Sequence, residues 1–494
     1  MKAQNARGTR DFSPLEVQRR TYIIHTIKKY FERYGFVPLE TPAIENLSTL
    51  TGKYGEEGDQ LLFKILNSRL HESKNKEQLK AEFERMLEKP YNSELITERA
   101  LRYDLTVPLA RYVSQNRHHI VFPFKRYQIQ PVWRADKPQK GRYREFTQCD
   151  ADIVGTDSLL MEVELIMLIN DVFTELIPQK GTNENLPSIE LHINHRRILQ
   201  GLAEWCGVAD KFYEFVAVLD QLDKTPVDEV KQLLINHLNI LSRKINDLFE
   251  MLNDYDNQRR KKIELEIHPN IANIETWKNL ADNLLHLANS YSLKKGIEEM
   301  NKVLELIDLN ALEILLKPNI KLARGLNYYT GVIFEAKTMV SESLSPLMTS
   351  SILGGGRYDN LTGIFDLPGI SGVGISFGID RLYDIMDALS LFYEKKLEEN
   401  TSADILLVYL DEESQRTSLN MAQHLRKNGI RVEVYHQLDK LKKMMEYAHK
   451  KNFPYVGIIG EQERKEHTIS LKDMKTGKQE STNIHELTTK LSKI

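Results

Sequence analysis

IVFPFKRYQIQPVWRADKPQKGRYREFTQCDADIVG, residues 120–155, is the segment from which the architecture of this chain can be argued. Two extended stretches flank residues 137–141, where proline and glycine interrupt both the helical and the strand periodicity. The simplest interpretation is a long β-hairpin with a basic turn.

The return strand of this hairpin is expected to carry a polar face. Side chains alternate along a strand, so Phe146, Gln148, Asp150 and Asp152 point to one side. Gln148 and Asp152 are then about 13 Å apart along the backbone, which suits the two ends of a small polar ligand. Arg134, at the end of the outgoing strand, adds a guanidinium suited to phosphate. The same pattern also fits an ordinary antiparallel ladder with a wet polar face.

The sequence on either side of the hairpin predicts a mixed α+β protein. Residues 13–35 have a capped amphipathic helical pattern, and residues 36–44 run extended through two prolines, which suits a sheet edge or a subunit boundary. Residues 67–98 are charged and helix-prone and are interpreted as an insertion or loop. The elements expected after the hairpin are a helix over 157–176, a strand over 189–194, a Lys/Glu-rich helical insertion over 196–312, strands with Gly-rich turns from 320 to 377, and a helix over 378–391.

A polar linker over residues 396–403 precedes a second folded part. Apolar runs over 405–410, 432–435 and 455–459 are separated by two helical stretches, which predicts a small α/β domain. Because no Gly-rich phosphate loop follows its first strand, this domain is not expected to bind a nucleotide.

The composition limits the class of protein. At roughly 150 residues per domain, 494 residues predict two to four domains. Neither a run of about 18 apolar residues nor a signal-peptide start is apparent, so we expect a cytoplasmic protein without a membrane span. Cys149 and Cys206 cannot supply a disulfide framework or a Cys-rich zinc site. The net charge of −3 restricts RNA binding to local basic patches, namely residues 134–144 and the segment after residue 403.

Two histidine groups invite a metal interpretation, residues 118–119 and residues 192–195. We reject it because no cysteine or paired carboxylate completes a ligand set, and the first pair is adjacent in sequence. Residues 354–357, GGGR, would by themselves predict a tight turn.

Six segments of the sequence have the character of family motifs, and their order along the chain is part of the pattern. They are GTRDFSP at 8–14, GFVPLETPAIE at 35–45, LRYDLTVPLARY at 101–112, Val132-Trp-Arg134 with the KPQKGRYREF loop, LARGLNYYTGVIFE at 322–335 and GVGISFGIDRL at 372–382. This set resembles the class II aminoacyl-tRNA synthetases. The form of the second motif and the RGLNYY segment are similar to those of the histidyl-tRNA synthetase family. The similarity extends into the C-terminal domain.

The resemblance implies an α+β fold with a class II catalytic core on an antiparallel sheet, a helical insertion, and a C-terminal α/β anticodon-binding domain. The expected boundaries are 1–195 and 313–398 for the two parts of the core, 196–312 for the insertion and 403–494 for the anticodon-binding domain. It further implies an enzyme that activates L-histidine with ATP and Mg²⁺ and transfers it to the 3′ end of tRNA(His). The family's first motif, around Pro42, implies a homodimer.

Residue roles follow from the same resemblance. Arg134 and Arg324 would be the catalytic cations at the ATP α-phosphate. ATP binding is expected at Arg134, Arg142, Phe146, Arg324 and Arg381, with the last arginine and Phe146 on the two faces of the adenine. Histidine binding is expected at Asp104, Thr106 and Gln148 for the α-amino group, and at Asp152, Tyr328 and Tyr329 around the imidazole. Residues 354–359 would form a Gly-rich strand-turn near ATP.

Several positions depart from the commonest bacterial pattern of the family. Asp104 and Asp152 stand where glutamate is frequent, and Asn327 stands where aspartate is commoner. The acid-for-acid changes shorten the side chain and keep its charge, so the expected substrate is unchanged. Two alternatives remain: a non-catalytic paralogue that regulates ATP phosphoribosyltransferase, against which the retained motifs argue, and a synthetase for threonine, proline or glycine, against which RGLNYY argues.

Overall fold

The computed structural model describes most of the chain in two compact units. The described residues are 3–52, 55–88, 92–138, 143–178, 188–223, 225–265, 267–323, 328–339, 351–395 and 403–492. One unit comprises Met1–Asp11 with Arg19–Leu391, and the other comprises Phe12–Gln18 with Phe392–Ile494.

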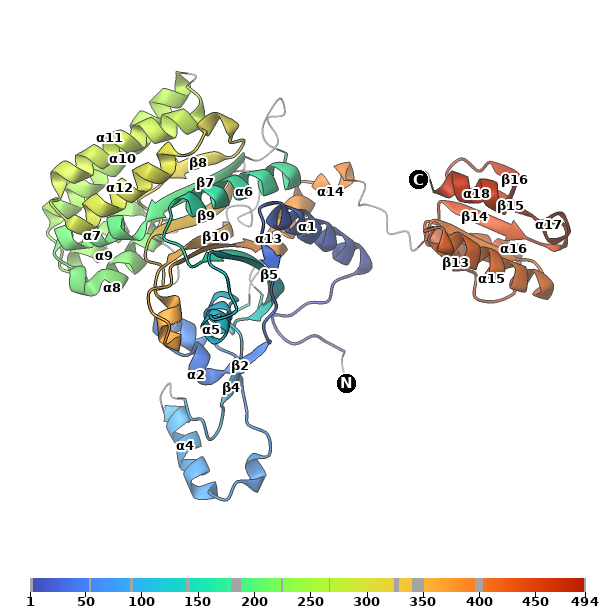
Figure 1. Ribbon diagram of the computed structural model, residues 1–494, viewed down its shortest axis with the longest axis horizontal. Helices are drawn as coiled ribbons and strands as arrows, with labels where there is room; N and C mark the ends of the chain where they lie inside the picture. Colours follow the sequence, from blue (N-terminus) through green and yellow to red (C-terminus); the bar gives the residue numbers. More distant parts are fainter. Residues whose placement is uncertain are drawn as a thin grey trace. The chain divides into compact units, whose positions relative to one another are not determined.

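An eight-stranded sheet runs through the larger unit (Figure 1). Its strands, in spatial order, are β1 (Val37–Pro38), β5 (Phe124–Trp133), β6 (Glu145–Val154), β11 (Gly372–Gly378), β10 (Ser351–Tyr358), β9 (Val332–Met339), β7 (Ser188–His195) and β8 (Leu315–Pro318). The outermost pair at each edge is parallel, and every pair between them is antiparallel. The expected hairpin is confirmed as β5 and β6, and β1, which contains Pro38, lies at the sheet edge as predicted for residues 36–44.

One face of this sheet is apolar and is covered by helices. Along β11, Val373, Ile375 and Phe377 are buried, and they alternate with glycine and serine on the opposite face. The Phe377 ring lies 6.1 Å from Phe31 of α1 (Pro14–Arg33) and 5.5 Å from Phe173 of α6 (Leu160–Leu176), between ring centroids. Burial of these rings fixes the helices on one side and leaves the other side of the central strands for a ligand.

Local chemistry explains where α1 begins. The Ser13 backbone N–H donates to Glu16 Oε2 at 2.6 Å, and the Glu16 N–H donates back to Ser13 Oγ at 3.4 Å. This reciprocal pair satisfies two of the N–H groups that a helix leaves open at its start. The capped helix expected over residues 13–35 is therefore confirmed.

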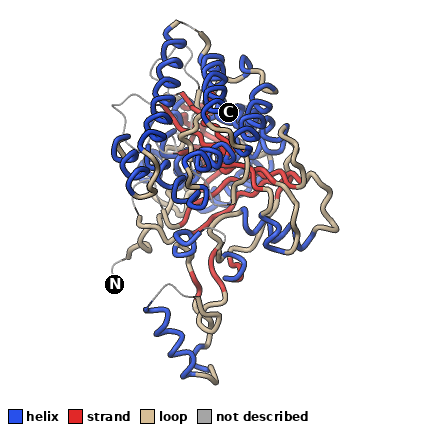
Figure 2. The backbone as a smooth tube through the Cα atoms, turned by 90° about the vertical axis from the view of Figure 1, so that its left-hand side faces the viewer, coloured by secondary structure: helices blue, strands red, loops and turns tan. Residues whose placement is uncertain are grey.

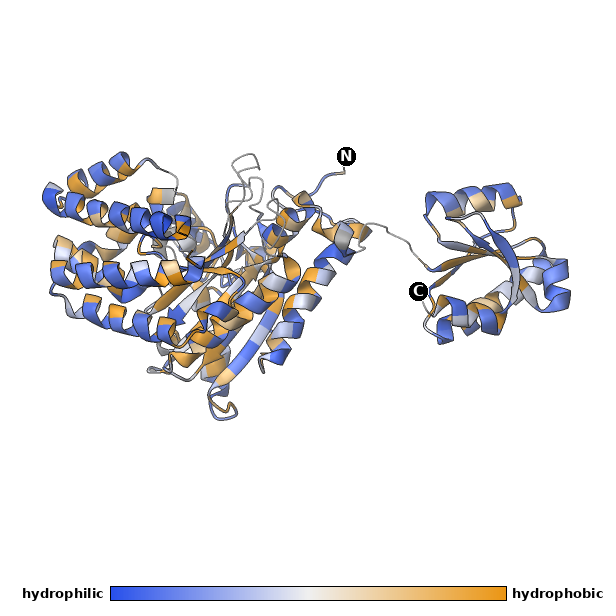
Figure 3. Cartoon of the chain, turned by 90° about the horizontal axis from the view of Figure 1, so that it is seen from above, coloured by the Kyte–Doolittle hydropathy of each residue, from blue (hydrophilic) through white to orange (hydrophobic). Residues whose placement is uncertain are grey.

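Residues 196–305 are largely helical and pack beside the β7 and β8 edge of the sheet. The helices are α7 (Arg196–Cys206), α8 (Phe212–Leu219), α9 (Val227–Asn236), α10 (Ser242–Glu264), α11 (Pro269–Leu287) and α12 (Tyr291–Glu305). Along these helices hydrophilic residues alternate with hydrophobic ones (Figure 3). Asn270 and Asn273 of α11 donate through Nδ2 to the backbone oxygens of Ile314 and Leu316, at 3.0 and 2.9 Å. These amides attach the helices to the last strand.

A small sheet and an arm lie beyond the other side of the large sheet. Strands β2 (Ile44–Asn46), β4 (Arg99–Leu101) and β3 (Lys64–Ile65) form a three-stranded antiparallel sheet. The intervening chain carries α4 (Lys76–Glu88), which has no buried residue and projects away from the body of the unit (Figures 1 and 2).

The smaller unit contains a five-stranded sheet. The predicted β-α-β-α-β order is confirmed as β12 (Ile405–Tyr409), α15 (Glu412–Lys427), β13 (Val432–Val434), α16 (Leu441–Lys450) and β14 (Tyr455–Ile459). An antiparallel pair and two helices follow, which the sequence analysis did not anticipate: α17 (Glu461–Glu466), β15 (Thr468–Asp473), β16 (Gln479–Asn483) and α18 (Ile484–Leu491).

Two expectations for the larger unit were wrong in detail. The strand placed at Ile320 begins earlier, at Leu315 in β8. The GGGR segment is not a turn but the interior of β10, because its glycines allow close approach between strands: a Cβ on Gly355 would lie 2.3 Å from the Gly374 carbonyl oxygen.

None of the described helices combines the length and apolar character needed to cross a bilayer.

Candidate functional site

The face of the large sheet opposite α1 and α6 is polar along its central strands, and we call it the polar face. It is formed by Arg126, Gln128 and Gln130 of β5, Gln148, Asp150 and Asp152 of β6, and Gly374, Ser376 and Gly378 of β11. The register places these side chains in rows across the sheet, so that Asp150 lies opposite Gln128 on one side and Ser376 on the other. The alternation predicted for the return strand is confirmed.

Gly374 leaves space for the carboxylate of Asp152. A Cβ built on Gly374 would lie 2.0 Å from Asp152 Oδ1, closer than any real contact. The absence of a side chain at this position of β11 therefore lets a buried acid lie flat on the polar face.

Asp152 is buried and held from two sides. Its Oδ2 lies 2.8 Å from Arg126 Nη2, and its Oδ1 accepts a 2.6 Å hydrogen bond from the Tyr358 hydroxyl. Burial raises the pKa of Asp152, and Arg126 opposes that shift. Burial and the nearby carboxylate likewise raise the pKa of Tyr358, so this phenol remains a hydrogen-bond donor. The carboxylate is thus fixed in place.

A second wall of the site comes from the start of α5 (Thr106–Asn116) and from the Tyr328–Tyr329 pair. Asp104 Oδ1 accepts the backbone N–H of Val107 at 3.2 Å, and Asp104 Oδ2 accepts the Tyr328 hydroxyl at 3.3 Å. The rings of Tyr328 and Tyr329 meet edge to face at 5.1 Å between centroids. The Tyr328 ring also lies 6.0 Å from the ring of Tyr358, which hydrogen-bonds Asp152, between centroids. Asp104 and the two tyrosines therefore lie at the same end of the polar face as Asp152, and Thr106 follows Asp104 at the start of α5.

Three acidic residues, Asp104, Asp150 and Asp152, line this end of the site beside the Arg126 cation, and burial raises the pKa of Asp150 to about 7. Burial is the main cause that raises the pKa of Tyr329. The nearby charges of Asp152, Asp150 and Asp104 raise it further. One tyrosine hydroxyl is therefore within electrostatic reach of all three acids. Such a pocket suits a ligand that carries a positive charge and several N–H donors.

The other end of the polar face carries cations and an aromatic ring. The Arg134 guanidinium lies 4.2 Å from the ring centroid of Tyr103 and 5.2 Å from that of Phe146, and its Nε donates to the Tyr103 carbonyl oxygen at 3.2 Å. Arg381, in the first turn of α13 (Ile379–Ala388), donates to the Ser351 carbonyl oxygen at 2.6 Å. Arg142 and Arg324, both expected to bind ATP, lie outside the described residues.

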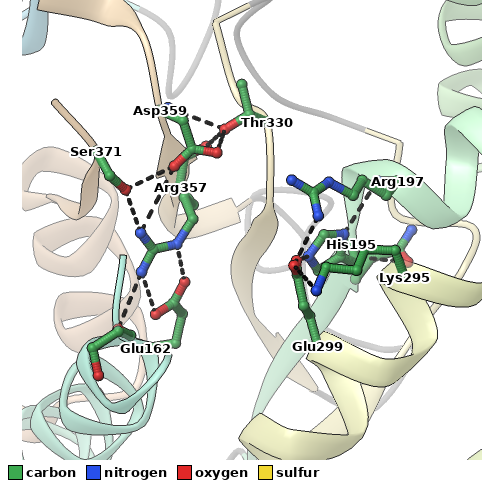
Figure 4. A network of polar contacts seen from close by, with 11 residues as sticks. Glu162, His195, Arg197, Lys295, Glu299, Thr330, Arg357, Asp359 and Ser371 are labelled. Carbon is green, nitrogen blue, oxygen red and sulfur yellow. Dashed lines mark hydrogen bonds and ion pairs between the residues drawn. The ribbon is translucent and has the colours of Figure 1, made fainter. Parts of the chain in front are cut away.

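Arg357, the arginine of the GGGR segment, faces away from this site. Figure 4 shows its guanidinium enclosed by Glu162 of α6, with Nε to Oε1 at 2.5 Å and Nη2 to Oε2 at 2.7 Å, and by Ser371. Because its donors are occupied by this buried ion pair, Arg357 joins α6 to the sheet and does not offer a cation to a phosphate.

Some residues of the site were missed by the sequence analysis. Arg126 could have been found, because counting outward from the hairpin turn places it opposite Asp152. Tyr358 and Ser376 were included only within the segments 354–359 and 372–382 that the resemblance singles out. Local periodicity could not place their side chains beside Asp152 and Asp150, because they lie more than 200 residues later in the chain. Asp380 was also missed: it accepts Arg10 Nη2 at 2.6 Å and also pairs with Arg20, which attaches the N-terminal segment beside α13.

Known proteins resemble this chain over its whole length. A family model described as histidyl-tRNA synthetase matches residues 94–382, and one described as an anticodon binding domain matches residues 404–494. The histidine–tRNA ligase of Cytophaga hutchinsonii is 43% identical and covers 98% of both chains. That of Porphyromonas gingivalis is 45% identical over 96% of this chain and 95% of its own. A crystal structure of histidyl-tRNA synthetase from Nostoc has a TM-score of 0.73 at 25% identity, covering 100% of this chain and 99% of the other.

Proposed function

The chain belongs to the histidyl-tRNA synthetase family, and from this premise we propose that its polar face is the site where histidine is activated for transfer to tRNA. The enzyme is a ligase that forms histidyl-adenylate from L-histidine and ATP. It then joins the histidyl group to the 3′ end of tRNA(His). The observation that carries the assignment to the polar face is that two buried acids, Asp104 and Asp152, lie at one end of it beside the Tyr328–Tyr329 pair.

The acidic end of the polar face is the proposed histidine pocket. Asp104, Thr106 and Gln148 would bind the α-ammonium group, which can only donate hydrogen bonds. Asp152 and Tyr329 would contact the two imidazole nitrogens, and Tyr328 would close the pocket. A site that hydrogen-bonds both nitrogens rejects analogues that lack one of them, because its buried polar groups would then lose their partners.

The cationic end is the proposed ATP site. Its residues would be Arg134, Arg142, Phe146, Arg324 and Arg381, with Arg134 and Arg324 as the catalytic pair. The histidine carboxylate attacks the α-phosphorus, a new C–O–P linkage forms, and the bond to pyrophosphate breaks. Negative charge grows on the α-phosphate oxygens during this step, and guanidinium groups held there stabilise it; one such contact is typically worth about 3 kcal/mol. In the second step a hydroxyl of the terminal ribose attacks the carbonyl carbon and AMP leaves.

Mg²⁺ is proposed to enter as part of the MgATP substrate. Among the described residues, no group of three or more His, Cys, Asp or Glu side chains is arranged to hold a metal ion. At nucleotide sites Mg²⁺ keeps several waters and is bound by phosphate oxygens together with one or two carboxylates. Its chemistry there is neutralisation of the departing pyrophosphate.

The domains, the oligomeric state and the cellular location are also assigned by this proposal. We assign residues 1–195 and 313–398 to the catalytic core, 196–312 to an insertion beside it, and 403–494 to anticodon binding. The match of residues 404–494 to an anticodon-binding family supports the last assignment. A homodimer through the first-motif region and a cytoplasmic location complete the proposal, since charged tRNA is consumed in translation.

Histidine-dependent exchange of labelled pyrophosphate into ATP tests the activation step. We expect exchange with histidine and none with threonine, proline or glycine, and charging of tRNA(His) by the same sample. A folded preparation without exchange would favour the regulatory paralogue, and exchange with another amino acid would reassign the substrate.

A further inference from the structure

Asp150 is a buried acid of the polar face to which the proposed binding roles give no task. It lies between Gln148 and Asp152 on β6 and is 2% exposed. Its Oδ1 is buried without a hydrogen-bond partner among the described residues. Ser376 of β11 lies directly opposite in the sheet register and hydrogen-bonds the Asp150 carboxylate. A buried acid between two ligand-binding positions calls for a physical reason.

The hydrogen bonds around Ser376 have one consistent direction when Asp150 is ionised, although burial raises the pKa of this acid to about 7. Gln148 Nε2 donates to Ser376 Oγ at 3.1 Å. A serine hydroxyl has a single proton, and an ionised carboxylate can only accept. Ser376 therefore donates its proton to Asp150 and accepts from the Gln148 amide nitrogen. The order runs from the Gln148 amide through the Ser376 hydroxyl to the Asp150 carboxylate.

This direction determines which atom of Gln148 is left for a ligand. With Nε2 engaged by Ser376, the remaining amide atom is Oε1, which is buried and has no partner among the described residues. An α-ammonium group has three N–H donors and no acceptor, so it can be bound by the amide oxygen but not by the amide nitrogen. If the Gln148 amide were reversed, its nitrogen would face the ammonium group, and hydrogen-bond donors would then point at each other.

We propose that Asp150 is a positioning residue for amino-acid recognition: acting through the Ser376 hydroxyl, it fixes the Gln148 amide with its oxygen toward the α-ammonium group of the substrate. The inference rests on the proposed function, because it names the ligand of Gln148. It deepens that function by assigning tasks to Asp150 and Ser376, neither of which is expected to touch the imidazole.

Electrostatics around Asp150 are consistent with this task. Burial raises the pKa of Asp150, Arg126 opposes that shift, and Asp152 adds to it. A cation bound at Gln148 favours the ionised carboxylate, which is the form that keeps Ser376 donating. Substrate binding and the direction of the hydrogen-bond chain therefore reinforce each other.

Substitutions at Ser376 separate positioning from charge. Ser376→Ala removes the hydroxyl and keeps the Asp150 carboxylate, whereas Ser376→Thr restores the hydroxyl. By calorimetry, we expect Ser376→Ala to raise the Kd of histidine about tenfold, the loss of one hydrogen bond to a charged group. Ser376→Thr should recover most of that loss, and KM for ATP should stay unchanged in both. Asp150→Asn should weaken histidine at least as much, because it also removes a charge.

An analogue without the amino group provides the second readout. The Kd or inhibition constant of imidazole propionate, which has the imidazole and carboxylate of histidine but no ammonium, should not change in Ser376→Ala. Cys149→Ala is the matched control, since it alters the same strand on the buried opposite face. It should leave both ligands unaffected even if it lowers the melting temperature.

Each contrary result has a separate meaning. Normal histidine binding by Ser376→Ala, with weak binding by Asp150→Asn alone, would show that Asp150 acts by direct charge and would overturn the proposal. Equal weakening of histidine and imidazole propionate would indicate general damage to the pocket and would also overturn it. Failure of the proposed function is distinguishable, because the wild-type enzyme would then show no histidine-dependent exchange.

Discussion

At the scale of single residues, we expect a substitution at a catalytic arginine to lower the rate of activation with little change in substrate binding. Arg324→Ala should lower the rate of histidine-dependent exchange by about 100-fold or more, the usual cost of one transition-state contact. KM for histidine and ATP should change much less, because the added charge on the α-phosphate develops only during the attack. Rapid-quench measurement of adenylate formation checks the rate directly.

A nearby cation provides the control for Arg324→Ala. Lys321 lies three positions earlier in the chain and forms an ion pair with Asp256, Nζ to Oδ2 at 2.7 Å. Lys321→Ala removes a positive charge from the same segment and should leave exchange at the wild-type rate. Normal exchange by Arg324→Ala would refute the role of that arginine.

Gly374 is a second residue whose replacement has a definite expected effect. In Gly374→Ala the new methyl group would overlap Asp152 Oδ1, at 2.0 Å, while Arg126 and Tyr358 resist movement of the carboxylate. We expect KM for histidine to rise by about tenfold or more, with KM for ATP unchanged. Steady-state exchange kinetics measure both constants.

Stability must be separated from binding in that experiment. Ile375→Val alters the neighbouring residue on the apolar face and should cost about 1 kcal/mol of stability without changing KM for histidine. If Gly374→Ala shows only a comparable loss of stability, the close approach to Asp152 has no bearing on histidine recognition.

At the scale of elements, the sequence predicts what lies within one strand or one hairpin. Alternation along residues 145–154 places the glutamine and both aspartates on one face, and the hairpin turn sets its own register. The pairing of β6 with β11 joins segments that are far apart in the sequence, and local periodicity does not predict such a pairing. The positions of Ser376 and Gly374 beside Asp150 and Asp152 could therefore not be predicted. Taken alone, GGGR predicts a turn although it lies inside β10, because glycine is common both in turns and in strands that approach closely.

The attachment of the helical insertion to the sheet should depend on pH through Glu190 of β7. This buried carboxylate lies 3.0 Å from His192 Nε2, 3.1 Å from Arg259 Nη2 of α10 and 3.4 Å from Lys317 Nζ of β8. Burial works to raise the pKa of Glu190, but the His192 hydrogen bond and the charges of Lys317 and Arg259 outweigh it and lower the pKa to about 2.

A lowered pKa stabilises the folded state above the pKa of the unfolded carboxyl, about 4.3, and that contribution is lost as the pH falls toward 2. Glu190→Gln should therefore unfold more easily than wild type at pH 7, and the difference should shrink below about pH 4. Trp277 of α11 is buried and reports on the insertion, provided that Trp133 and Trp205 are replaced by phenylalanine. Glu275→Gln, at a half-exposed ion pair with Lys262, is the control and should change stability only slightly at pH 7. A constant difference for Glu190→Gln would contradict the assignment.

At the scale of the whole molecule, the edge of the large sheet is the surface expected to join two chains. β1 is a short strand at that edge, and Val37 and, in nearby β2, Ile44 are 48% and 49% exposed, in the region that resembles the family's dimer-forming motif. Apolar side chains on an open strand edge are costly in a monomer and are commonly covered by a partner. We expect the wild-type protein to sediment with twice the mass of the chain.

Charges introduced at this edge should separate the two chains. Val37→Asp combined with Ile44→Asp places four carboxylates in the proposed interface of a dimer, where burial and mutual repulsion oppose association. The variant should sediment as a monomer at micromolar concentration, and its exchange activity should fall because the first motif supports the strand beside the polar face. Leu241→Asp is the control, since Leu241 is 68% exposed in the helical insertion and should leave the dimer intact. A wild-type monomer, or a double variant that still sediments as a dimer, would show that this edge is not where the chains meet.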